Sequence, residues 1–448
     1  MSTAKVPVPA KEVPVYREAD VVVVGGGVAG IAAAVAAARK GKKVVLLEKN
    51  AALGGLATLG HVCIYLPLDD GAGNKVFKGL AEELLYTTIK YGYNNLEDCW
   101  GRGIDRVEQP TDRYQTHFNI PAAVFAFDEL CEEEKIETIF DVVFSEPILE
   151  GNRVTGVICE SKQGPVAIMG KAFVDASGDA DLMARAGAET VSKDSICSHW
   201  TYELEFSQMK EGMEYGDVLH CLRLRWLGLR PDMNNENAPV PQFRGTTIEG
   251  VNGYLKTSRK LGLAYLKKNQ RPDYAMLTLP TMPQFRTSRH IVGMESLAYE
   301  TDADKANSNS VGIVCWGLAN PAPVYEYPYG GIVDRKLENV FAAGRIVAVS
   351  DDKGWEMMRL IPACVFTGEV AGVAAAQLLD EGTTAQALDV AKLQKTLEGN
   401  GIQIHMSPEM KGNVNKLKYD NPKKAGSPLI FADALSYDDP HDKLAEEA

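Results

Sequence analysis

The sequence predicts an α/β fold, in which an inserted α+β domain caps a Rossmann-like nucleotide-binding domain. Three observations lead to this prediction. A strand, a glycine-rich turn, a helix and a second strand follow one another between residues 21 and 48. The chain has 448 residues, which is enough for two or three packed units. Between residues 191 and 329 the pattern changes to Trp, Tyr, Pro and Arg at irregular spacing, which indicates a different kind of domain.

The first of these elements is a dinucleotide-binding fingerprint. Val21–Val24 is apolar on both faces, as a buried parallel strand requires. Gly25, Gly27 and Gly30 then occupy the three glycine positions of G-x-G-x-x-G, and an Ala-rich helix is predicted over 28–40. We expect the glycines, in this order, to permit a tight turn, the approach of a pyrophosphate and close helix packing. The phosphates would lie at the helix N-terminus, where backbone N–H groups are free.

The second strand, residues 43–48, ends in Glu48, where a carboxylate can accept hydrogen bonds from the hydroxyls of an adenosine ribose. The uncharged stretch 21–38 is long enough to be considered as a membrane span. Its glycines and alanines make it weakly apolar, so strand, turn and helix are the better interpretation. We therefore expect no membrane partner.

A second glycine pair, Gly54 and Gly55, follows the acid within Leu53–Thr58. Here the sequence resembles the glutathione-reductase-like FAD family, in which such a segment runs beside the pyrophosphate and flavin. The resemblance implies FAD, and not NAD, as the cofactor. The cofactor contacts predicted in this part of the chain are Gly25, Gly27, Ala29, Gly30, Glu48, Lys49, Gly54, Gly55, Ala57 and Thr58.

Two later strand ends extend the resemblance. Ala172–Asp181 is similar to the A-T-G motif of that family, and Asn339–Arg345 is an apolar strand that ends in Gly-Arg. Arg359–Cys364 then opens an Ala/Gly-rich helix over 365–379, and the resemblance implies that its N-terminus points at the flavin. The contacts predicted from this half are Val143, Ala176, Ser177, Gly178, Asp179, Gly344, Arg345, Arg359 and Ala363.

Positions 20–190 and 330–400 together resemble the bacterial FAD-dependent oxidoreductase family of the glutathione-reductase-like FAD/NAD(P)-binding superfamily. Phe285–Gly293 is similar to its R-x-S-R-x-x-x-G segment. A three-stranded meander is predicted over 138–170, with turns near Gly151 and Gly164. The predicted domains are a discontinuous FAD domain (18–60, 120–190 and 330–385), a helical insertion (61–119), a substrate or cap domain (191–329) and a C-terminal extension (386–448).

Catalytic candidates are Arg286, Arg289 and His290, three cationic or titratable groups within five residues. They could clamp a carboxylate or carry a proton. The alternative is a structural arginine network at a domain joint. His61 follows the second glycine pair and could act as an acid/base or attach flavin covalently, or it could be an ordinary core or loop histidine.

Composition excludes several function classes. The chain has 47 Lys and Arg against 60 Asp and Glu, a net charge of -13, so a nucleic-acid partner is not expected. The eight cysteines form no C-x-x-C, so neither a cysteine metal site nor a redox disulfide is expected, and no metal is predicted. Reduced thiols and the absence of a signal-peptide pattern predict a cytoplasmic protein.

The sequence contains one G-x-G-x-x-G fingerprint, and a second one with its own strands is missing. This argues against a dedicated nicotinamide-binding domain. We therefore predict an FAD-dependent oxidoreductase that transfers a hydride between flavin N5 and a small polar, possibly anionic, organic substrate. The electron acceptor or donor is left open, as is a homo-oligomeric state. The alternatives are an FAD-containing enzyme without net substrate redox, such as a hydratase, isomerase or synthase, and a non-enzymatic flavin-binding protein.

Overall fold

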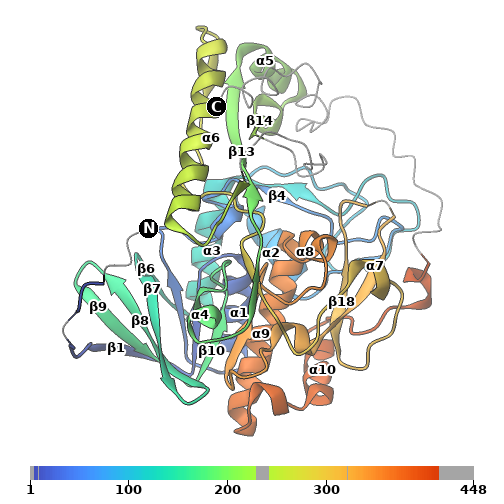
Figure 1. The fold of residues 1–448 in the computed structure, drawn as a ribbon. Coiled ribbons are helices and arrows are strands. Elements are labelled where there is room, and N and C mark those ends of the chain that lie inside the picture. The colour runs from blue at the N-terminus through green and yellow to red at the C-terminus, as the bar shows by residue number, and fades with distance from the viewer. Residues whose placement is uncertain (1–4, 9, 229–241, 320, 413–448) are drawn as a thin grey trace.

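The computed structural model describes residues 5–8, 10–228, 242–319 and 321–412. At its centre lies a five-stranded sheet in the order β20, β10, β2, β3, β6, in which every neighbouring pair is parallel. Its strands are Val340–Ala342 (β20), Ala172–Asp175 (β10), Val21–Val24 (β2), Val44–Glu48 (β3) and Glu137–Phe140 (β6). This sheet confirms the predicted α/β fold with a Rossmann-like unit (Figure 1).

Two helices with small residues pack closely at the centre of the molecule (Figure 1). They are α1 (Val28–Arg39) and α9 (Ile361–Glu381). A Cβ added to Gly368 would lie 2.2 Å from the carbonyl oxygen of Ala29, so only glycine allows this approach. By length and composition α9 could cross a membrane, but its apolar window is entirely buried inside the protein, which explains that composition.

A second sheet, in the order β1, β9, β8, β7, contains the predicted meander. Its strands are Val15–Glu18 (β1), Gly164–Met169 (β9), Arg153–Ser161 (β8) and Val143–Glu150 (β7). The turns fall at the two predicted glycines, Gly151 and Gly164. The predicted start at residue 138 was wrong, because Thr138 belongs to β6 and pairs with Leu46 in the parallel sheet.

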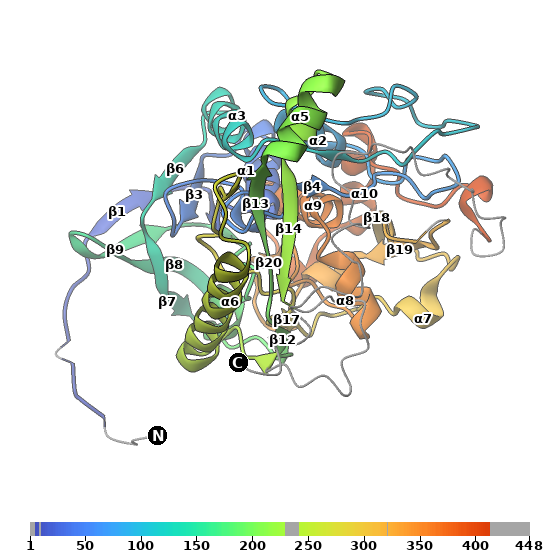
Figure 2. The same ribbon diagram turned by 90° about the horizontal axis from the view of Figure 1, so that it is seen from above.

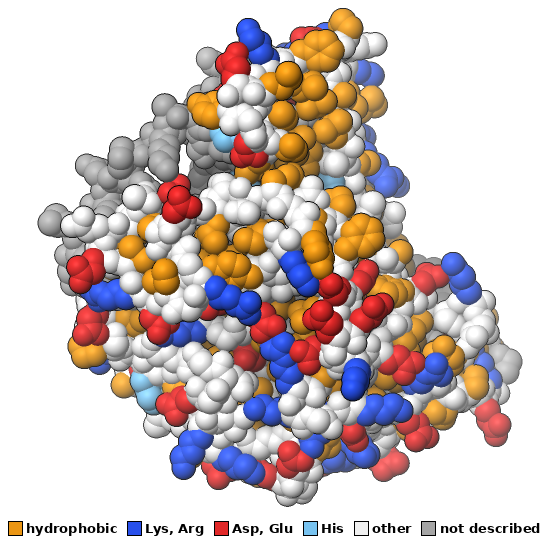
Figure 3. Space-filling view, turned by 180° about the vertical axis from the view of Figure 1, so that it is seen from behind, with side chains coloured by type: hydrophobic (Ala, Val, Ile, Leu, Met, Phe, Trp, Pro, Cys, Tyr) orange, Lys and Arg blue, Asp and Glu red, His pale blue; other side chains and the backbone are white. Residues whose placement is uncertain are grey.

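Within the predicted cap segment, residues 198–228 and 242–286 form a cap whose sheet and helices project from the molecule (Figures 1 and 2), whereas residues 310–315 and 324–328 pack into the large core of the main body. The three-stranded sheet of the cap has the order β14, β13, β16, and two helices flank it. These elements are Ser198–Glu205 (β13), Arg223–Gly228 (β14), Tyr274–Met276 (β16), Phe206–Tyr215 (α5) and Ile248–Lys268 (α6). Cys197, Tyr254, Leu261 and Phe285 form a small core of its own. Figure 3 shows many apolar side chains on this projecting part; exposed ones on α5 include Phe206 and Met213.

The remaining elements are short. The predicted helical insertion over 61–119 contains one helix, α2 (Leu80–Thr88), and two two-residue strands, β4 (Ile64–Tyr65) and β5 (Thr116–His117). The other helices are α3 (Ile120–Glu133), α4 (Asp181–Arg185), α7 (Tyr299–Asp302), α8 (Asp352–Met358) and α10 (Val390–Gly399). The other strands are β11 (Thr190–Ser192), β12 (Ser195–Ile196), β15 (Gln242–Phe243), β17 (Arg289–Ile291), β18 (Ser310–Cys315) and β19 (Val324–Pro328). The predicted domain limits stay a prediction, and most of the C-terminal extension, from 413 on, lies outside the described residues.

Candidate functional site

A cavity of about 660 Å³ lies between the glycine-rich turns of the α/β unit and the cap. Most of the predicted cofactor contacts line it, together with one predicted catalytic residue. The predicted residues on its wall are Gly25, Gly27, Ala29, Glu48, Lys49, Gly54, Gly55, Ala57, Val143, Ala176, Ser177, Gly178, Asp179, Arg286, Gly344, Arg345 and Arg359. Segments that are far apart in the chain therefore meet at one site.

The three fingerprint glycines are needed for different reasons. Gly25 has φ 108°, and a Cβ there would lie 2.4 Å from the carbonyl oxygen of Ala176 at the end of β10. A Cβ on Gly30 would lie 1.8 Å from the carbonyl oxygen of Gly25, so this residue lets helix and strand pack and does not line the cavity. A Cβ on Gly27 would meet no atom within 4 Å. Gly27 therefore leaves space in the cavity that the protein itself does not fill.

Glu48 fastens the glycine turn to the end of β3. Its Oε2 accepts a hydrogen bond from the Gly26 N–H at 2.8 Å, and its Oε1 accepts from the backbone and side-chain nitrogens of Asn50 at 2.8 and 2.7 Å. The carboxylate is buried, yet it still forms part of the cavity wall. It can therefore hold the turn and also face a bound ligand.

Two helix N-termini open onto the cavity without a side-chain cap. Helix α1 begins after Gly27 and α9 begins after Leu360, and neither preceding residue caps the helix with a side chain. Gly27 and Val28 line the cavity at one terminus, and Ile361 and Cys364 line it at the other. Free N–H groups and the positive end of each helix dipole favour an anion or a developing negative charge here.

Two arginines, Arg345 and Arg359, line the cavity. Arg345 donates to Asp179 Oδ1 at 2.6 Å, but its Nε, like that of Arg359, is buried and has no hydrogen-bond partner among the described residues. Burial lowers the pKa of Arg359. Burial would by itself raise the pKa of Asp179, but the charge of Arg345 and a hydrogen bond from Ser288 lower it below its usual range. The positive charge of the two arginines on the wall, the open space at Gly27 and the helix termini together fit a pyrophosphate-containing dinucleotide.

The cap supplies the opposite wall. The loop Thr281–Arg286 and the segment around the start of α6 both line the cavity. The guanidinium of Arg286 lies 5.1 Å from the Trp226 ring centre and 5.9 Å from that of Trp200, and it donates to Ser198 Oγ at 3.3 Å. Cation–π contacts with the two indoles restrict the position of this cation.

Arg289 and His290 lie outside the cavity wall. Both belong to β17, which pairs with β11. Arg289 donates to the Asp179 carbonyl oxygen at 2.7 Å and to Asp181 Oδ1 at 2.9 Å. His290 is buried, with its Nδ1 2.9 Å from its neighbour's carbonyl oxygen, and burial lowers its pKa. Their placement favours the structural network that the sequence left as the alternative to a substrate clamp.

Three further predicted residues also lie off the cavity wall. His61 has φ 59°, its Nδ1 lies 3.3 Å from Thr278 Oγ1, and burial lowers its pKa. This packing favours the loop-histidine interpretation. Thr58 donates to the Leu53 carbonyl oxygen at 2.6 Å, and Ala363 is buried in α9. Thr58 therefore stabilises the conformation of the second glycine segment without lining the cavity.

Sequence reasoning missed the cap residues of the wall. These include Gly245, Thr246, Thr247, Ile248, Val251, Asn252, Thr281, Met282, Pro283, Gln284 and Phe285. Thr247 is an N-cap whose side chain accepts from the Gly250 N–H, and Thr followed by an amphipathic run is a helix-start pattern that could have been recognised. Gln284 belongs to no motif and gave no signal.

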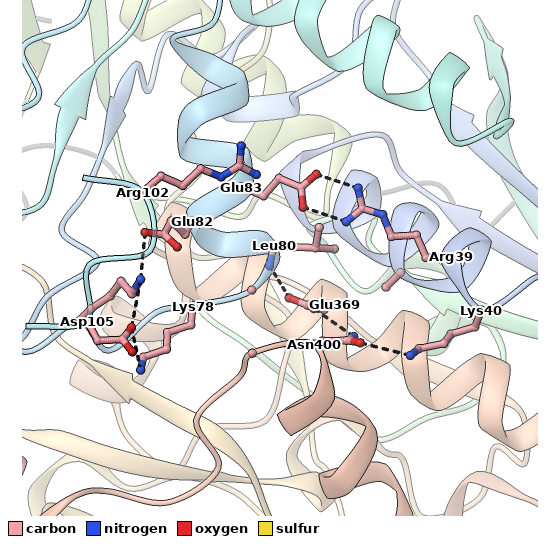
Figure 4. A pocket seen from close by; sticks show the side chains of 14 residues that line it. Arg39, Lys40, Lys78, Leu80, Glu82, Glu83, Arg102, Asp105, Glu369 and Asn400 are labelled. Carbon is pink, nitrogen blue, oxygen red and sulfur yellow. Dashed lines mark hydrogen bonds and ion pairs between the residues drawn. The ribbon is translucent and has the colours of Figure 1, made fainter. Parts of the chain in front are cut away.

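A second cavity, of about 450 Å³, lies between α1, α2 and α9 (Figure 4). None of the predicted site residues line it. Its charges pair mainly with one another: Lys75 with Glu82 at 3.0 Å and Arg39 with Glu83 at 2.7 Å. Glu369 accepts from the Leu80 N–H at 2.7 Å. These contacts join α2 to α1 and to α9.

Comparison with known proteins gives one family match. A family model described as FAD dependent oxidoreductase matches residues 20–215 and 222–397. None of the curated proteins searched matches the chain. One similar solved structure is p-nitrophenol 4-monooxygenase PnpA from Pseudomonas putida DLL-E4, with 14% identity over 88% of this chain and 91% of that one and a TM-score of 0.47. Another is 3-ketosteroid-delta4-(5alpha)-dehydrogenase from Rhodococcus jostii RHA1, with 15% identity over 81% of this chain and 97% of that one and a TM-score of 0.38.

Proposed function

Because the chain belongs to the FAD dependent oxidoreductase family and its cofactor is FAD, we propose that it transfers a hydride between flavin N5 and a C–H bond of a small polar, anionic substrate. Bound FAD supplies a ring that takes up or releases a hydride. The protein binds and orients both partners. An oxidoreductase of this family acts on a small molecule and exchanges electrons with a redox partner.

The residues that would hold FAD are those of the α/β wall. Gly27 and the N-terminus of α1 would receive the pyrophosphate, and Arg345 and Arg359 on the cavity wall would supply positive charge beside it. Glu48 would accept from the adenosine ribose with its remaining lone pairs. The N-terminus of α9 would stabilise negative charge on the reduced ring, because its free N–H groups open onto the cavity.

The observation that carries the substrate proposal is the position of Arg286. It lines the same cavity as the FAD elements but comes from the cap, and two indoles hold its planar guanidinium. A held guanidinium can bind a carboxylate through two parallel hydrogen bonds. Arg286 is therefore the residue that we assign to the anionic group of the substrate.

The direct test is anaerobic mixing of the yellow protein with hydroxy acids, sugars and enoates. Bleaching of the flavin by a hydroxy acid supports hydride transfer from an anionic substrate. Turnover with an unchanged flavin spectrum would instead select an enzyme without net substrate redox. If only neutral sugars bleach the flavin, the anionic substrate is wrong.

Arg286→Leu tests the anion role separately. We expect it to weaken binding of an anionic substrate about ten- to a hundredfold, the usual effect of losing a charged hydrogen bond. Arg271→Leu is the control, because Arg271 pairs with Glu205 and Asp273 and does not line the cavity. If both variants lose the same amount of substrate affinity, Arg286 does not bind the anionic group of the substrate.

We propose a cytoplasmic location and leave a homo-oligomer as an untested option. All eight cysteines lie in the described part of the chain as free thiols, which suits a reducing compartment.

A further inference from the structure

The cap helix α6 has one buried face and one exposed face. Its buried side chains recur every three or four residues, so they share the face that packs into the cap. These include Tyr254, Ser258, Leu261 and Tyr265. Exposed basic side chains share the opposite face, which we call the basic face of α6. They are Lys256, Arg259, Lys260 and Lys267. The helix forms an outer edge of the projecting cap, so this face is open to solvent (Figure 1).

The positive charge of the basic face is not balanced by neighbouring acids. The only acid of α6 is Glu249, in its first turn, and none of the four cations forms an ion pair with a residue that the structure describes. Elsewhere on the surface exposed lysines are paired, as Lys162 is with Asp141. The chain as a whole has a net charge of -13. The basic face therefore has the opposite sign to the rest of the protein, which favours an anionic partner.

Apolar side chains lie among these cations. Leu263 is three residues after Lys260 and four before Lys267, so it lies on the basic face, and it is 54% exposed. Leu266 is about two turns after Arg259 and is 37% exposed. Figure 3 shows Lys and Arg side chains at the edge of an apolar area on the projecting part. Exposed leucines gain nothing from a purely ionic partner, but they are stabilised by contact with acyl chains.

We propose that the basic face of α6 docks the protein on the surface of an anionic lipid bilayer. The four cations contact lipid phosphates, and Leu263 and Leu266 reach the boundary between headgroups and acyl chains. The cytoplasmic leaflet of a membrane carries such a negative surface, which fits the proposed location. A peripheral contact needs no spanning segment, so it agrees with the strand, turn and helix at 21–38. The inference is independent of hydride transfer.

The test measures binding of the FAD-loaded, full-length protein to vesicles by sedimentation. Vesicles of pure phosphatidylglycerol are compared with vesicles of pure phosphatidylcholine. We expect the protein to bind the first and not the second. Salt at about 1 M, which screens charges beyond about 3 Å, should release it. Binding to neither kind of vesicle, or equal binding to both, would overturn the proposal.

The cations are tested by the triple variant Lys256→Gln, Arg259→Gln, Lys260→Gln. Each basic residue at an anionic surface strengthens binding roughly fivefold, so the loss of three should weaken binding to phosphatidylglycerol vesicles about a hundredfold. None of the three residues lines the FAD cavity, so an unchanged FAD content shows that the variant is folded.

The matched control removes the same charge from the main body, in the triple variant Arg335→Gln, Lys336→Gln, Lys395→Gln. These residues are also exposed, and none forms an ion pair within the described part of the chain. We expect this control to change vesicle binding less than about threefold, because charges away from the contact are screened. An equal loss in the two triple variants would mean that net charge alone matters, and the basic face would not be the contact.

The double variant Leu263→Gln, Leu266→Gln separates a bilayer from other anionic partners. It keeps every cation, and both side chains are exposed, so the fold does not depend on them. We expect it to bind phosphatidylglycerol vesicles about tenfold more weakly, because it loses the apolar contact. Unchanged vesicle binding would overturn the proposal. So would tighter binding of duplex DNA or polyglutamate than of the vesicles by wild type, because the partner would then be a nucleic acid or an acidic protein.

Discussion

The first turn needs glycine at positions 25 and 27 for two different reasons. Gly25 is constrained by the protein, because a side chain there would collide with the backbone of Ala176. Gly27 has φ -70°, which any residue can adopt, and a Cβ there would meet nothing. The requirement for glycine at 27 therefore comes from the ligand.

This difference gives the first prediction. Gly27→Val keeps the fold but does not retain stoichiometric FAD, because the new side chain occupies the approach of the pyrophosphate to the backbone. The measurement is the ratio of bound FAD to protein after purification, beside a thermal melt. Gly399→Val is the control, since a Cβ at Gly399 also meets no atom within 4 Å and this residue lies in α10, away from the cavity. Full FAD content in Gly27→Val would contradict the assignment.

Arg289 illustrates how a charged residue beside a site can belong to the scaffold. Its Nε and one terminal nitrogen contact the Asp179 carbonyl and Asp181, so Arg289→Lys loses the two-point contact while keeping the charge. We expect the free energy of unfolding to fall by about 1–2 kcal/mol, with FAD affinity per folded molecule unchanged. Urea unfolding measures the first quantity and flavin titration the second.

The control for Arg289→Lys is Arg271→Lys. Arg271 makes exposed ion pairs with Glu205 and Asp273 on the cap, and such pairs contribute little to stability. We therefore expect its free energy of unfolding to stay within about 0.5 kcal/mol of wild type. If Arg289→Lys has normal stability but no longer binds substrate, Arg289 contacts the substrate and this prediction is wrong.

At the scale of elements, the carboxyl group of Glu369 joins α9 to the start of α2. It accepts from the Leu80 N–H at the N-terminus of α2, and it is 2% exposed (Figure 4). Burial raises its pKa from 4.5 to about 7. The folded protein therefore binds a proton at Glu369 at pH values where the unfolded chain has released it.

The sign of the pH effect follows from this difference. Between pH 4.5 and about 7 the contribution of Glu369 to stability falls as the pH rises, because ionisation is easier in the unfolded chain. We expect Glu369→Gln to lack this fall. As the pH rises through this window, the free energy of unfolding of Glu369→Gln should increase relative to that of wild type by up to about 3 kcal/mol. Urea unfolding at a series of pH values gives the difference, in which all other titrating groups cancel. A difference that stays constant with pH would contradict the prediction.

The elements that could be predicted from the sequence are those with local signals. The strand Val21–Val24, the helix after it and the strand ending at Glu48 were predicted to within one or two residues, because the glycine fingerprint fixes their order. Strand β6 was wrongly predicted to be part of the meander. Its true partner is β3, which is far away in the chain. Pairing across such a separation depends on tertiary packing and leaves no local pattern.

The same limit applies to the site. Arg286 and Arg289 belong to one motif, but only Arg286 lines the cavity. The strand β17 begins at Arg289, and its pairing with β11 accompanies the contact between Arg289 and Asp181. Spacing in the sequence cannot show where an extended loop ends and a strand begins. Gln284 was missed because it belongs to no motif, and only the folded structure brings its loop to the cavity.

At the scale of the whole molecule, the cavity separates two parts that have cores of their own. The large core includes both faces of the parallel sheet, while the cap has the small core around Tyr254. Direct contacts such as Gln284 with Gly60 and Ser288 with Asp179 join the two parts across the cavity. A ligand that contacts both walls adds to these contacts, so it stabilises the molecule as a whole.

FAD and FMN should therefore stabilise the flavin-free protein to different extents. Glu48 and the cap loop line the same cavity, so FAD would have walls on both sides to contact. FMN lacks the adenosine that Glu48 is expected to bind. At a concentration 100-fold above its Kd, a ligand that binds only the folded state adds about 2.7 kcal/mol, which raises the melting temperature by several degrees. We expect this rise with FAD, and a much smaller one with FMN at the same concentration. Glu48→Ala is the matched variant, and it should reduce the FAD shift towards that of FMN. Equal shifts with both flavins in wild type would mean that the adenosine half makes no contribution and that Glu48 serves only the turn at Gly26.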